Sequence, residues 1–326
     1  MSGKPTPRLS VAPMMDWTDR HCRYFHRLLA PSATLYTEMV TAMALVHGDV
    51  DTLLAFDASE HPVVLQVGGS DPLMMRNAAL LAEQFGYDGV NINVGCPSER
   101  VQSGSFGACL MAEPALVAAC YERMQEAVSI PVTVKTRIGI DDKDSDAFLA
   151  QFVETLVGAG CHHFDIHARV AILKGLSPKQ NRSVPPLQYD RVYRLKQANP
   201  NLVIVMNGGI ETVDAAIRHL EIVDGVMIGR EAYHNPWSLT HFEQLVNPRS
   251  PAPNRTQVVH TMVSYAERQM AEGVQLKHIT RHLLGLFAGL PGARQWRRML
   301  SEHSHKPETT PDLLLEALAA RDNVAA

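Results

Sequence analysis

The chain has 326 residues, of which 46% are hydrophobic and 20% are charged, and its formal net charge is −4. This length suits one large α/β domain, with or without a small second domain. The composition excludes disordered and fibrous proteins. The slightly acidic balance excludes a protein that is basic throughout, although it is compatible with a local basic face.

Cysteine usage and the lack of long apolar runs predict a cytoplasmic protein. The five cysteines are an odd number without a C-x-x-C pair, which excludes a disulfide scaffold and a zinc ribbon, so we expect no metal site. Residues 1–10 lack the apolar core of a signal peptide. No apolar run approaches the roughly 20 residues that a membrane span needs.

Short runs rich in valine and isoleucine alternate with amphipathic helices up to Gly229. Most of these runs are continuously apolar, which is typical of parallel strands that are buried on both faces. Helices are expected between them, for example over Pro72–Phe85, Pro114–Ala127 and Ala147–Ala159. The eight predicted strands are Leu9–Met14, Leu35–Val40, Val63–Val67, Gly89–Val94, Val132–Arg137, His163–Ala168, Val203–Asn207 and Gly225–Gly229.

Eight successive βα units predict an α/β fold of the (β/α)8 TIM-barrel type. The alternative is a doubly wound open sheet, which usually has fewer strands and often carries a G-x-G-x-x-G turn after the first one. Here the first strand ends in Ala12–Asp16, which contains no glycine, so the barrel is favoured. After Trp237 only helices are expected, over Gln257–Met270, Gln275–Leu286 and Ala293–Leu300.

We therefore expect three parts along the chain. Residues 1–240 form the TIM-barrel catalytic domain, residues 241–254 form a proline-rich linker, and residues 255–326 form a small C-terminal all-helical domain.

In TIM barrels, the active site lies at the C-terminal ends of the strands and in the loops that follow them. Polar side chains in buried strands cost free energy unless they have partners. Their concentration at one rim therefore predicts a ligand site. The residues at the eight strand ends are Pro13, Met14, Met15, Glu38, Gln66, Asn93, Cys96, Lys135, Arg137, His167, Arg169, Asn207, Gly208, Gly209, Gly229 and Arg230.

The ends of the seventh and eighth strands predict a phosphate site. Asn207, Gly208 and Gly209 follow one buried strand, and Gly229 and Arg230 follow the next. Glycines let backbone N–H groups approach an anion closely, and Arg230 adds positive charge. Phosphate sites of TIM barrels usually lie at these two loops. Either loop alone could be a tight turn, but the pair together with Arg230 favours phosphate binding.

Lys135 and His167 lie within predicted strands and should point into the mouth of the barrel. Lys135 could pair with Glu38, form a Schiff base as in aldolases, or balance the negative charge of a cofactor ring. His167 could be a hydrogen-bonded core residue. Their positions alone do not distinguish these roles.

Cys96 lies in the loop after the fourth strand, so its thiol is expected at the rim. A single cysteine is more often a small buried hydrophobic residue, and the other four cysteines mostly fit that description. Cys109 is the second candidate for a reactive thiol, because the segment Ser103–Gly107 before it is expected to be mobile.

Two segments carry an excess of positive charge. Ala168–Gln197 has a net charge of +6 and begins with a long loop on the expected active face, whereas Arg255–Arg298 has a net charge of +5 in the helical tail. Such segments are ordinarily solvated surfaces, but a basic rim beside a concave site predicts a polyanionic substrate. The candidate contacts are Lys179, Arg182, Arg294, Arg297 and Arg298, of which the last three share one helix face.

Several motifs in this order resemble those of the tRNA-dihydrouridine synthases. The resemblance covers about Leu9 to Trp237, and the helical tail also fits it. Pro185–Asp190 and the arginine-rich helix resemble the A-type subfamily, which modifies positions 20 and 20a. The motifs are Ala12–Asp19, Gln66–Gly69, Asn91–Ser98 with Gly104 and Gly107 after it, Val134–Arg137, His167–Arg169, Asn207–Ile210 and Gly229–Arg230.

The resemblance implies an enzyme with tightly bound FMN that uses NADPH to reduce the 5,6 double bond of a uridine in the tRNA D-loop. Hydride would pass from reduced FMN to C6 of the base, and Cys96 would give a proton to C5 as general acid. NADPH would bind only transiently. The target base would be extruded from the folded tRNA at a cost of roughly a few kcal/mol. A monomer is expected.

The resemblance also implies roles for single residues. Pro13, Met14 and Met15 would line the flavin, Gln66 would bond its ring, and Asn93 would contact the base. Lys135 and His167 would lie near the negative charge of the reduced ring. The phosphate would be held by Asn207, Gly208, Gly209, Gly229 and Arg230.

Other functions remain open from the residues alone. A small-molecule flavin dehydrogenase of the dihydroorotate or dihydropyrimidine type would share the phosphate loops but would not need the arginine-rich tail. An RNA-binding protein without catalysis would not need Cys96, Lys135 and His167 together. An aldolase would use Lys135 as a Schiff base.

Overall fold

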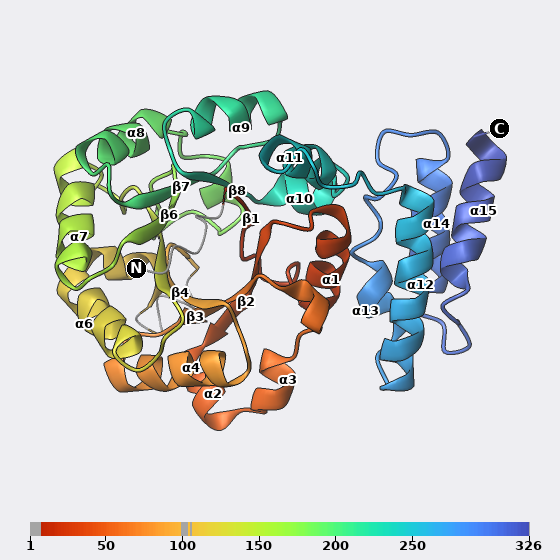
Figure 1. Cartoon of the computed structure of the whole chain (residues 1–326), viewed down its shortest axis with the longest axis horizontal. Coiled ribbons are helices and arrows are strands. Elements are labelled where there is room, and N and C mark those ends of the chain that lie inside the picture. The colour runs from red at the N-terminus through yellow and green to blue at the C-terminus, as the bar shows by residue number, and fades with distance from the viewer. Residues whose placement is uncertain (1–7, 99–103, 105, 326) are drawn as a thin grey trace. The chain divides into compact units, whose positions relative to one another are not determined.

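The computed structural model describes residues 8–98, 104 and 106–325 and contains a closed barrel of eight parallel strands in sequence order (Figure 1). The barrel closes where Leu9, Ser10 and Val11 of the first strand pair with the last. The TIM barrel is confirmed, and the open sheet is excluded. The strands are β1 (Leu9–Val11), β2 (Thr34–Thr41), β3 (Val63–Gly68), β4 (Gly89–Val94), β5 (Val132–Arg137), β6 (His163–His167), β7 (Val203–Asn207) and β8 (Gly225–Ile228).

Strand ends differ from the predicted ones by at most three residues, and the largest difference has a local cause. β1 ends at Val11 rather than at Met14. The N–H of Ala12 still donates to the carbonyl of Ile228, but Pro13 has no N–H and cannot continue the ladder. The chain therefore leaves the sheet early and carries Pro13 to Met15 onto the rim.

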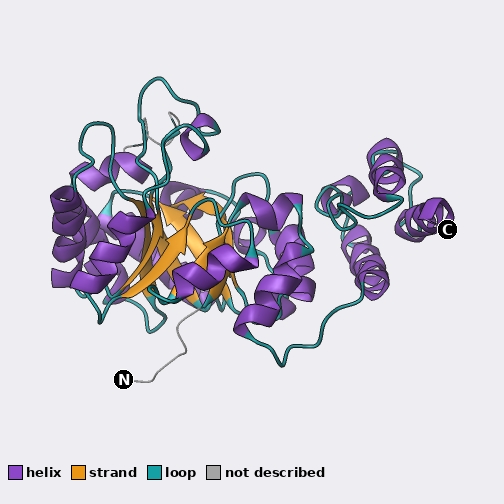
Figure 2. Ribbon diagram, turned by 90° about the horizontal axis from the view of Figure 1, so that it is seen from above, coloured by secondary structure: helices purple, strands orange, loops and turns teal. Residues whose placement is uncertain are grey.

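Helices surround the strands of this unit (Figure 2). Side-chain caps begin two of these helices: Asp71 accepts hydrogen bonds from Leu73 and Met74, with Pro72 as the first helical residue, and Thr212 caps the helix after β7. The helices are α2 (Ala42–His47), α3 (Val50–Leu54), α4 (Pro72–Gln84), α6 (Pro114–Gln125), α7 (Asp146–Gly158), α8 (Tyr189–Ala198) and α9 (Val213–Leu220), with 3-10 turns η1 (Ala58–Glu60), η2 (Gly107–Ala112) and η3 (Gln180–Arg182).

The barrel interior has an apolar part and a polar part. Ala12, Tyr36, Val64, Val205 and Met227 form a buried apolar cluster contributed by β2, β3, β7, β8 and the end of β1. The strands β4, β5 and β6 contribute buried amide, hydroxyl and carboxylate groups instead. The polar part is where the ligand chemistry is concentrated.

By its contacts, the chain divides into two compact units. The first comprises Met1–Asp16 with Ala33–Gly229, and the second comprises Trp17–Ser32 with Arg230–Ala326. The helix after β1, α1 (Arg20–Leu29), therefore groups with the C-terminal helices. The division into a barrel domain (1–240), a linker (241–254) and a helical domain (255–326) stays a prediction.

Polar and aromatic contacts hold α1 in the second unit. The carboxylate of Asp19 caps α1 and pairs with Arg281 and His282. Burial alone would raise the pKa of Asp19, but hydrogen bonds and charge from these two partners lower it well below its ordinary value. Tyr24 stacks on Tyr265 with ring centroids 3.9 Å apart.

A buried tryptophan on α14 (Ala293–His303) packs against the segment that follows α13 (Leu276–Thr280). Trp296 is fully buried, and its indole N–H donates to the carbonyl of Leu283. The helix expected to reach Leu286 ends at Thr280, and turns follow it because Gly285, Gly289 and Pro291 interrupt the helical pattern. The remaining helices of the second unit are α10 (Arg230–His234), α11 (Ser238–Val246), α12 (Arg255–Ala271), α13 (Leu276–Thr280), α14 (Ala293–His303) and α15 (Leu313–Ala325).

Two further features concern the expected linker and the membrane. The last six of the nine residues of α11 occupy positions 241–246 of the expected linker, whereas residues 247–254 contain neither helix nor strand. Within the described ranges, no helix combines the length and the apolar character that crossing a membrane requires.

Candidate active site

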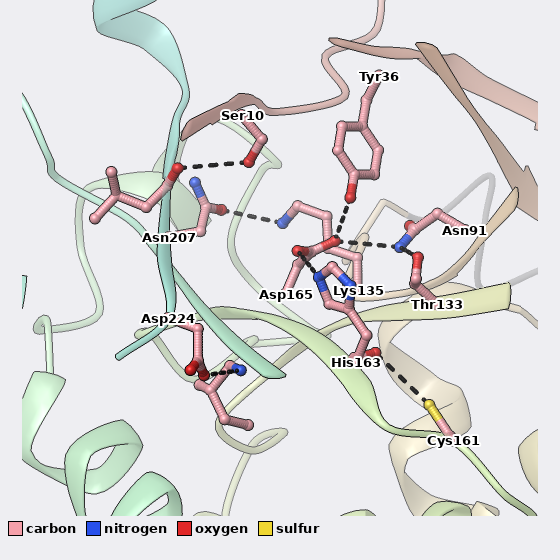
Figure 3. A network of polar contacts seen from close by, with 12 residues as sticks. Ser10, Tyr36, Asn91, Thr133, Lys135, Cys161, His163, Asp165, Asn207 and Asp224 are labelled. Atoms are coloured by element: carbon pink, nitrogen blue, oxygen red, sulfur yellow. Dashed lines mark hydrogen bonds and ion pairs between the residues drawn. The ribbon is translucent and has the colours of Figure 1, made fainter. Parts of the chain in front are cut away.

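A hydrogen bond across the barrel joins two residues predicted to bind a cofactor. The ammonium of Lys135 on β5 donates to Oδ1 of Asn207 at the end of β7, at 3.0 Å. These strands are not neighbours, so the bond must run through the barrel interior (Figure 3). The Nδ2 of Asn207 donates to the carbonyl of Met227 on β8 at 2.8 Å, which fixes the amide orientation.

A chain of three amides leads from the interior to the loop after β4. Asn91 accepts from Nε2 of Gln66 at 2.8 Å, and Gln66 accepts from Nδ2 of Asn93 at 2.9 Å. Asn93 accepts from the backbone N–H groups of Gly95 and Cys96, at 3.1 and 3.0 Å. The structure thus brings Gln66, Asn93 and Cys96 together, as the strand-end prediction required.

Sequence reasoning missed a buried carboxylate at the inner end of this row of amides. Asp165 on β6 is fully buried, and its carboxylate accepts from Tyr36 and Asn91 and lies 3.2 Å from Nε2 of His163 (Figure 3). Polar residues occupy every second position of β6, at His163, Asp165 and His167. This alternation was a signal for a polar interior, because alternate residues of a barrel strand face inward.

The pKa of Lys135 is low for a lysine. Burial lowers it to about 8, the charge of Asp165 opposes this shift, and Arg137 adds to it. Arg137 lies on the same strand, whereas Asp165 lies opposite Lys135 on β6. The ammonium is therefore positively charged at neutral pH and loses its charge under mildly alkaline conditions.

Cys96 is distinguished from the other cysteines by its surroundings. It is half-buried, and its thiol lies 3.5 Å from the hydroxyl of Ser98. Cys109 is also half-buried, but its thiol donates to the carbonyl of Phe106, and burial raises its pKa. Burial raises the pKa of both Cys120 and Cys161 to about 12. The expected mobility before Cys109 falls partly on residues 103 and 105, which lie outside the described residues.

The loop after β7 strongly favours glycines at two positions. Gly208 and Gly209 have φ angles of +112° and +66°, in the region that L side chains rarely adopt. A Cβ on Gly209 would lie 2.5 Å from Leu187, and one on Gly208 would lie 3.2 Å from Nε2 of His167. At Gly229 a Cβ would meet nothing within 4 Å, so there is open space beside the backbone there.

Arg137 ties the loop of Cys96 to the basic loop after β6. Its guanidinium is buried and donates to the carbonyls of Gly95, Val170 and Asn181. Burial lowers its pKa to about 10, so it stays charged at neutral pH. Asn181 in turn exchanges hydrogen bonds with the backbone of Ile172, which joins two parts of the long loop at this point.

The remaining predicted site residues lie at the surface or at the rim. Pro13 and Met14 are half-buried, with Met14 against the apolar cluster, and Met15 is 55% exposed. Arg230 is the first residue of α10, directly after Gly229. Lys179 and Arg182 are exposed on the loop after β6. Arg294, Arg297 and Arg298 are exposed on α14, opposite Trp296, and belong to the second unit.

The comparisons with known proteins identify the family. A family model described as dihydrouridine synthase matches residues 10–323. The chain belongs to the dihydrouridine synthase family. The members of this family are flavin-dependent oxidoreductases, so the chain is an enzyme of that class.

Three relatives from different bacteria illustrate the similarity, and each bears the name tRNA-dihydrouridine(20/20a) synthase. The relative from Vibrio cholerae is 56% identical over 96% of this chain and 96% of its own length. That from Xanthomonas axonopodis pv. citri is 56% identical over 97% and 94%. That from Salmonella typhimurium is 55% identical over 97% and 96%.

The residues present fit a flavin with a phosphate group. The two positive-φ glycines and the open space at Gly229 form a cradle in which backbone can approach an anion. Lys135 supplies a buried cation beside Asn207, and Gln66 and Asn93 supply amide groups at the same rim.

Proposed function

We propose that the protein reduces uridine in the D-loop of tRNA to 5,6-dihydrouridine, with positions 20 and 20a as its targets. The observation that carries this proposal is the half-buried thiol of Cys96 at the mouth of the barrel. The backbone N–H of Cys96 donates to Asn93, which is the last of the three hydrogen-bonded amides. The same barrel holds the cation of Lys135. The names of the similar relatives support the choice of substrate and positions.

The flavin is proposed to be FMN, with NADPH as its transient reductant. Asn207, Gly208, Gly209, Gly229 and Arg230 would hold the phosphate. Gln66 would hydrogen-bond the ring, while Pro13, Met14 and Met15 would line it. The bound flavin supplies the hydride for C6 of uracil. Among the residues of the chain, Lys135 and His167 would stabilise negative charge on the ring by proximity.

Cys96 is proposed to be the proton donor to C5. A hydride at C6 and a proton at C5 together saturate the double bond, so the chain must supply one acid near the base. The thiol of Cys96 at the rim meets this need. Cys109 is less suitable because its thiol already donates a hydrogen bond to the carbonyl of Phe106. Asn93 would contact the base from the same strand end.

The tRNA is proposed to bind to two basic surfaces. Lys179 and Arg182 belong to the loop that Arg137 ties to the loop of Cys96, so phosphate contacts there would lie close to the chemistry. Arg294, Arg297 and Arg298 provide a second exposed surface on α14. Contacts of this kind can compensate for the cost of extruding the target base.

The experiment that tests this function uses unmodified tRNA. The purified protein is incubated with FMN, NADPH and a tRNA transcript, and dihydrouridine is measured by mass spectrometry of the digested RNA. We expect dihydrouridine at positions 20 and 20a. Reduction of free uracil or oxidation of dihydroorotate without activity on tRNA would favour the small-molecule dehydrogenase instead.

The phosphate site is tested by replacing Arg230. Arg230→Ala should yield protein that retains FMN markedly less well, because one positive charge beside the glycine cradle is lost. Flavin absorbance per mole of purified protein measures this retention, and Arg218→Ala, an exposed arginine on α9, is the control. Full flavin occupancy in the Arg230 variant would contradict the assignment.

The charge of Lys135 predicts a pH dependence. Its pKa lies at about 8, so reduction of the bound flavin by NADPH should slow as the pH rises through this value. The protonated fraction of Lys135 falls by about tenfold between pH 7 and 9, and the positive charge that favours the reduced ring falls with it. Stopped-flow bleaching of the flavin from pH 6.5 to 9.5 measures the effect.

Two variants distinguish the titration of Lys135 from a titration of the flavin itself. Lys135→Met should be slow throughout and should lack the decrease near pH 8. Lys179→Met, an exposed lysine, should follow the wild type. A decrease that persists in Lys135→Met would assign the titration to another group.

A further inference from the structure

Asp165 is a buried carboxylate to which the proposed reaction gives no contact with flavin or base, although its charge opposes the fall of the Lys135 pKa. Two donors meet Oδ2, namely the hydroxyl of Tyr36 at 3.0 Å and Nδ2 of Asn91 at 3.2 Å, and His163 lies 3.2 Å from Oδ1. Burial of Tyr36, together with the neighbouring charge of Asp165, raises the pKa of the tyrosine well above its ordinary value. Tyr36 therefore keeps its proton and acts as donor. The carboxylate is thus held in one place in the barrel interior (Figure 3).

The chemistry of a carboxylate imposes a direction on the amide next to it. An ionised carboxylate only accepts hydrogen bonds, whereas an amide can turn either its oxygen or its NH2 group toward a neighbour. Asn91 must therefore turn its NH2 group toward Asp165 and its oxygen toward Gln66. The hydroxyl of Thr133, at 2.8 Å from the same NH2 group, imposes no direction because a hydroxyl both donates and accepts.

The direction then passes along the chain, one amide at a time. Gln66 donates to Asn91, so its oxygen faces Asn93. Asn93 donates to Gln66, so its oxygen faces the N–H groups of Gly95 and Cys96. Backbone N–H groups only donate, so both ends of the chain require the same direction. The inner end lies in a strand, whereas the outer end lies in a loop, and loops move more readily.

We propose that Asp165 is a positioning residue that fixes, from the barrel interior, the hydrogen-bonding direction of Gln66 and Asn93 at the reaction site. The oxygen of Asn93 is occupied by two backbone N–H groups, so the group it can offer to a base is its second amide hydrogen. A donor suits a carbonyl oxygen of uracil, and the reversed amide would present an oxygen that repels it. The effect on catalysis rests on the proposed function.

The test removes the acceptor-only end of the chain. In Asp165→Asn the new amide can donate or accept, so both directions become available at the inner end. Asp165→Ser is a second variant with the same expectation, in case the first does not fold. Thr133→Val is the matched control, because it removes the other partner of the same Asn91 NH2 group but leaves the carboxylate in place.

Hydrogen exchange provides a readout that does not depend on activity. In the flavin-loaded full chain, the N–H groups of Gly95 and Cys96 should exchange about fivefold faster in the Asp165 variants, which corresponds to about 1 kcal/mol of lost hydrogen bonding. Exchange in β4, β5 and β6 should stay at the wild-type rate, as should exchange at Gly95 and Cys96 in Thr133→Val. Mass spectrometry of the peptides that cover residues 89–98 measures this.

Turnover with tRNA supplies the second readout. The kcat for dihydrouridine formation should fall about tenfold in Asp165→Asn with KM unchanged, because the base is misoriented while the RNA surface is intact. Unchanged exchange at Gly95 and Cys96 in a folded variant overturns the proposal. Equal acceleration in Thr133→Val, or acceleration across all strands, also overturns it. A wild-type protein that forms no dihydrouridine overturns the proposed function instead and leaves the exchange result valid.

Discussion

Replacing Cys96 by alanine should lower the rate of dihydrouridine formation by about 10²- to 10⁴-fold, the usual contribution of a general acid. Flavin retention and flavin reduction by NADPH should stay at wild-type levels, because the thiol does not belong to the phosphate cradle or to the pair formed by Lys135 and Asn207. Single-turnover reduction of tRNA, monitored by mass spectrometry of nucleosides, measures the loss, and flavin bleaching measures the step that should survive.

Cys109→Ala is the matched control for this experiment. Its thiol is also half-buried, but it donates to the carbonyl of Phe106. The loss of one such contact should leave the rate within a few-fold of the wild type. If Cys109→Ala abolished the reaction and Cys96→Ala did not, the proton donor would be Cys109. If neither variant lost activity, water or another residue would deliver the proton.

The sequence was sufficient to predict the strands and to group polar side chains at one end of the barrel, where the candidate site lies. Continuous apolar runs give parallel strands, eight of them close a barrel, and a barrel collects its polar strand ends at one rim. This reasoning placed Gln66, Asn93, Cys96, Lys135 and Asn207 at that rim. Its errors at strand ends were local, as at Pro13, where a missing N–H ends the ladder before the apolar pattern does.

The cross-barrel contacts could not be predicted, because they depend on distances between strands that are not neighbours. Tyr36 on β2 meets Asp165 on β6, and neither the spacing nor the residue type of Tyr36 signals this partner. The alternation of polar residues in β6 indicated that Asp165 faces inward, but it did not indicate what the carboxylate meets there.

The grouping of α1 with the C-terminal helices was also beyond sequence reasoning. A helix between two barrel strands is expected to belong to the barrel, yet α1 is tied to the tail by the pairs of Asp19 with Arg281 and His282. These partners are 262 and 263 residues apart in the chain. Such long-range pairs leave no periodic pattern in the sequence.

Replacing Arg294, Arg297 and Arg298 together by alanine should weaken tRNA binding by about 10²-fold at moderate salt, at about 1 kcal/mol for each lost phosphate contact. All three side chains are exposed on α14, while Trp296 on the opposite face is buried. The slope of log affinity against log salt should fall by up to about three, because each phosphate contact releases about one counterion.

The structure sharpens this expectation for Arg298, which forms an exposed i, i+4 pair with Glu302 at 3.2 Å. This pair is worth little in water, but it competes with a phosphate for the guanidinium. Glu302→Gln should therefore strengthen tRNA binding slightly and steepen its salt dependence.

A variant with the same change in net charge separates contact from bulk electrostatics. Arg76, Arg123 and Arg218 are exposed on α4, α6 and α9, and replacing all three by alanine also removes three positive charges. If the α14 arginines contact phosphates, their loss should change the salt slope far more than this control does, with flavin content and NADPH oxidation intact in both variants. If the two triple variants changed the salt slope equally, the α14 arginines would act on tRNA only through the net charge of the protein. The proposed RNA surface would then consist of Lys179 and Arg182 on the loop after β6, which Arg137 joins to the loop of Cys96.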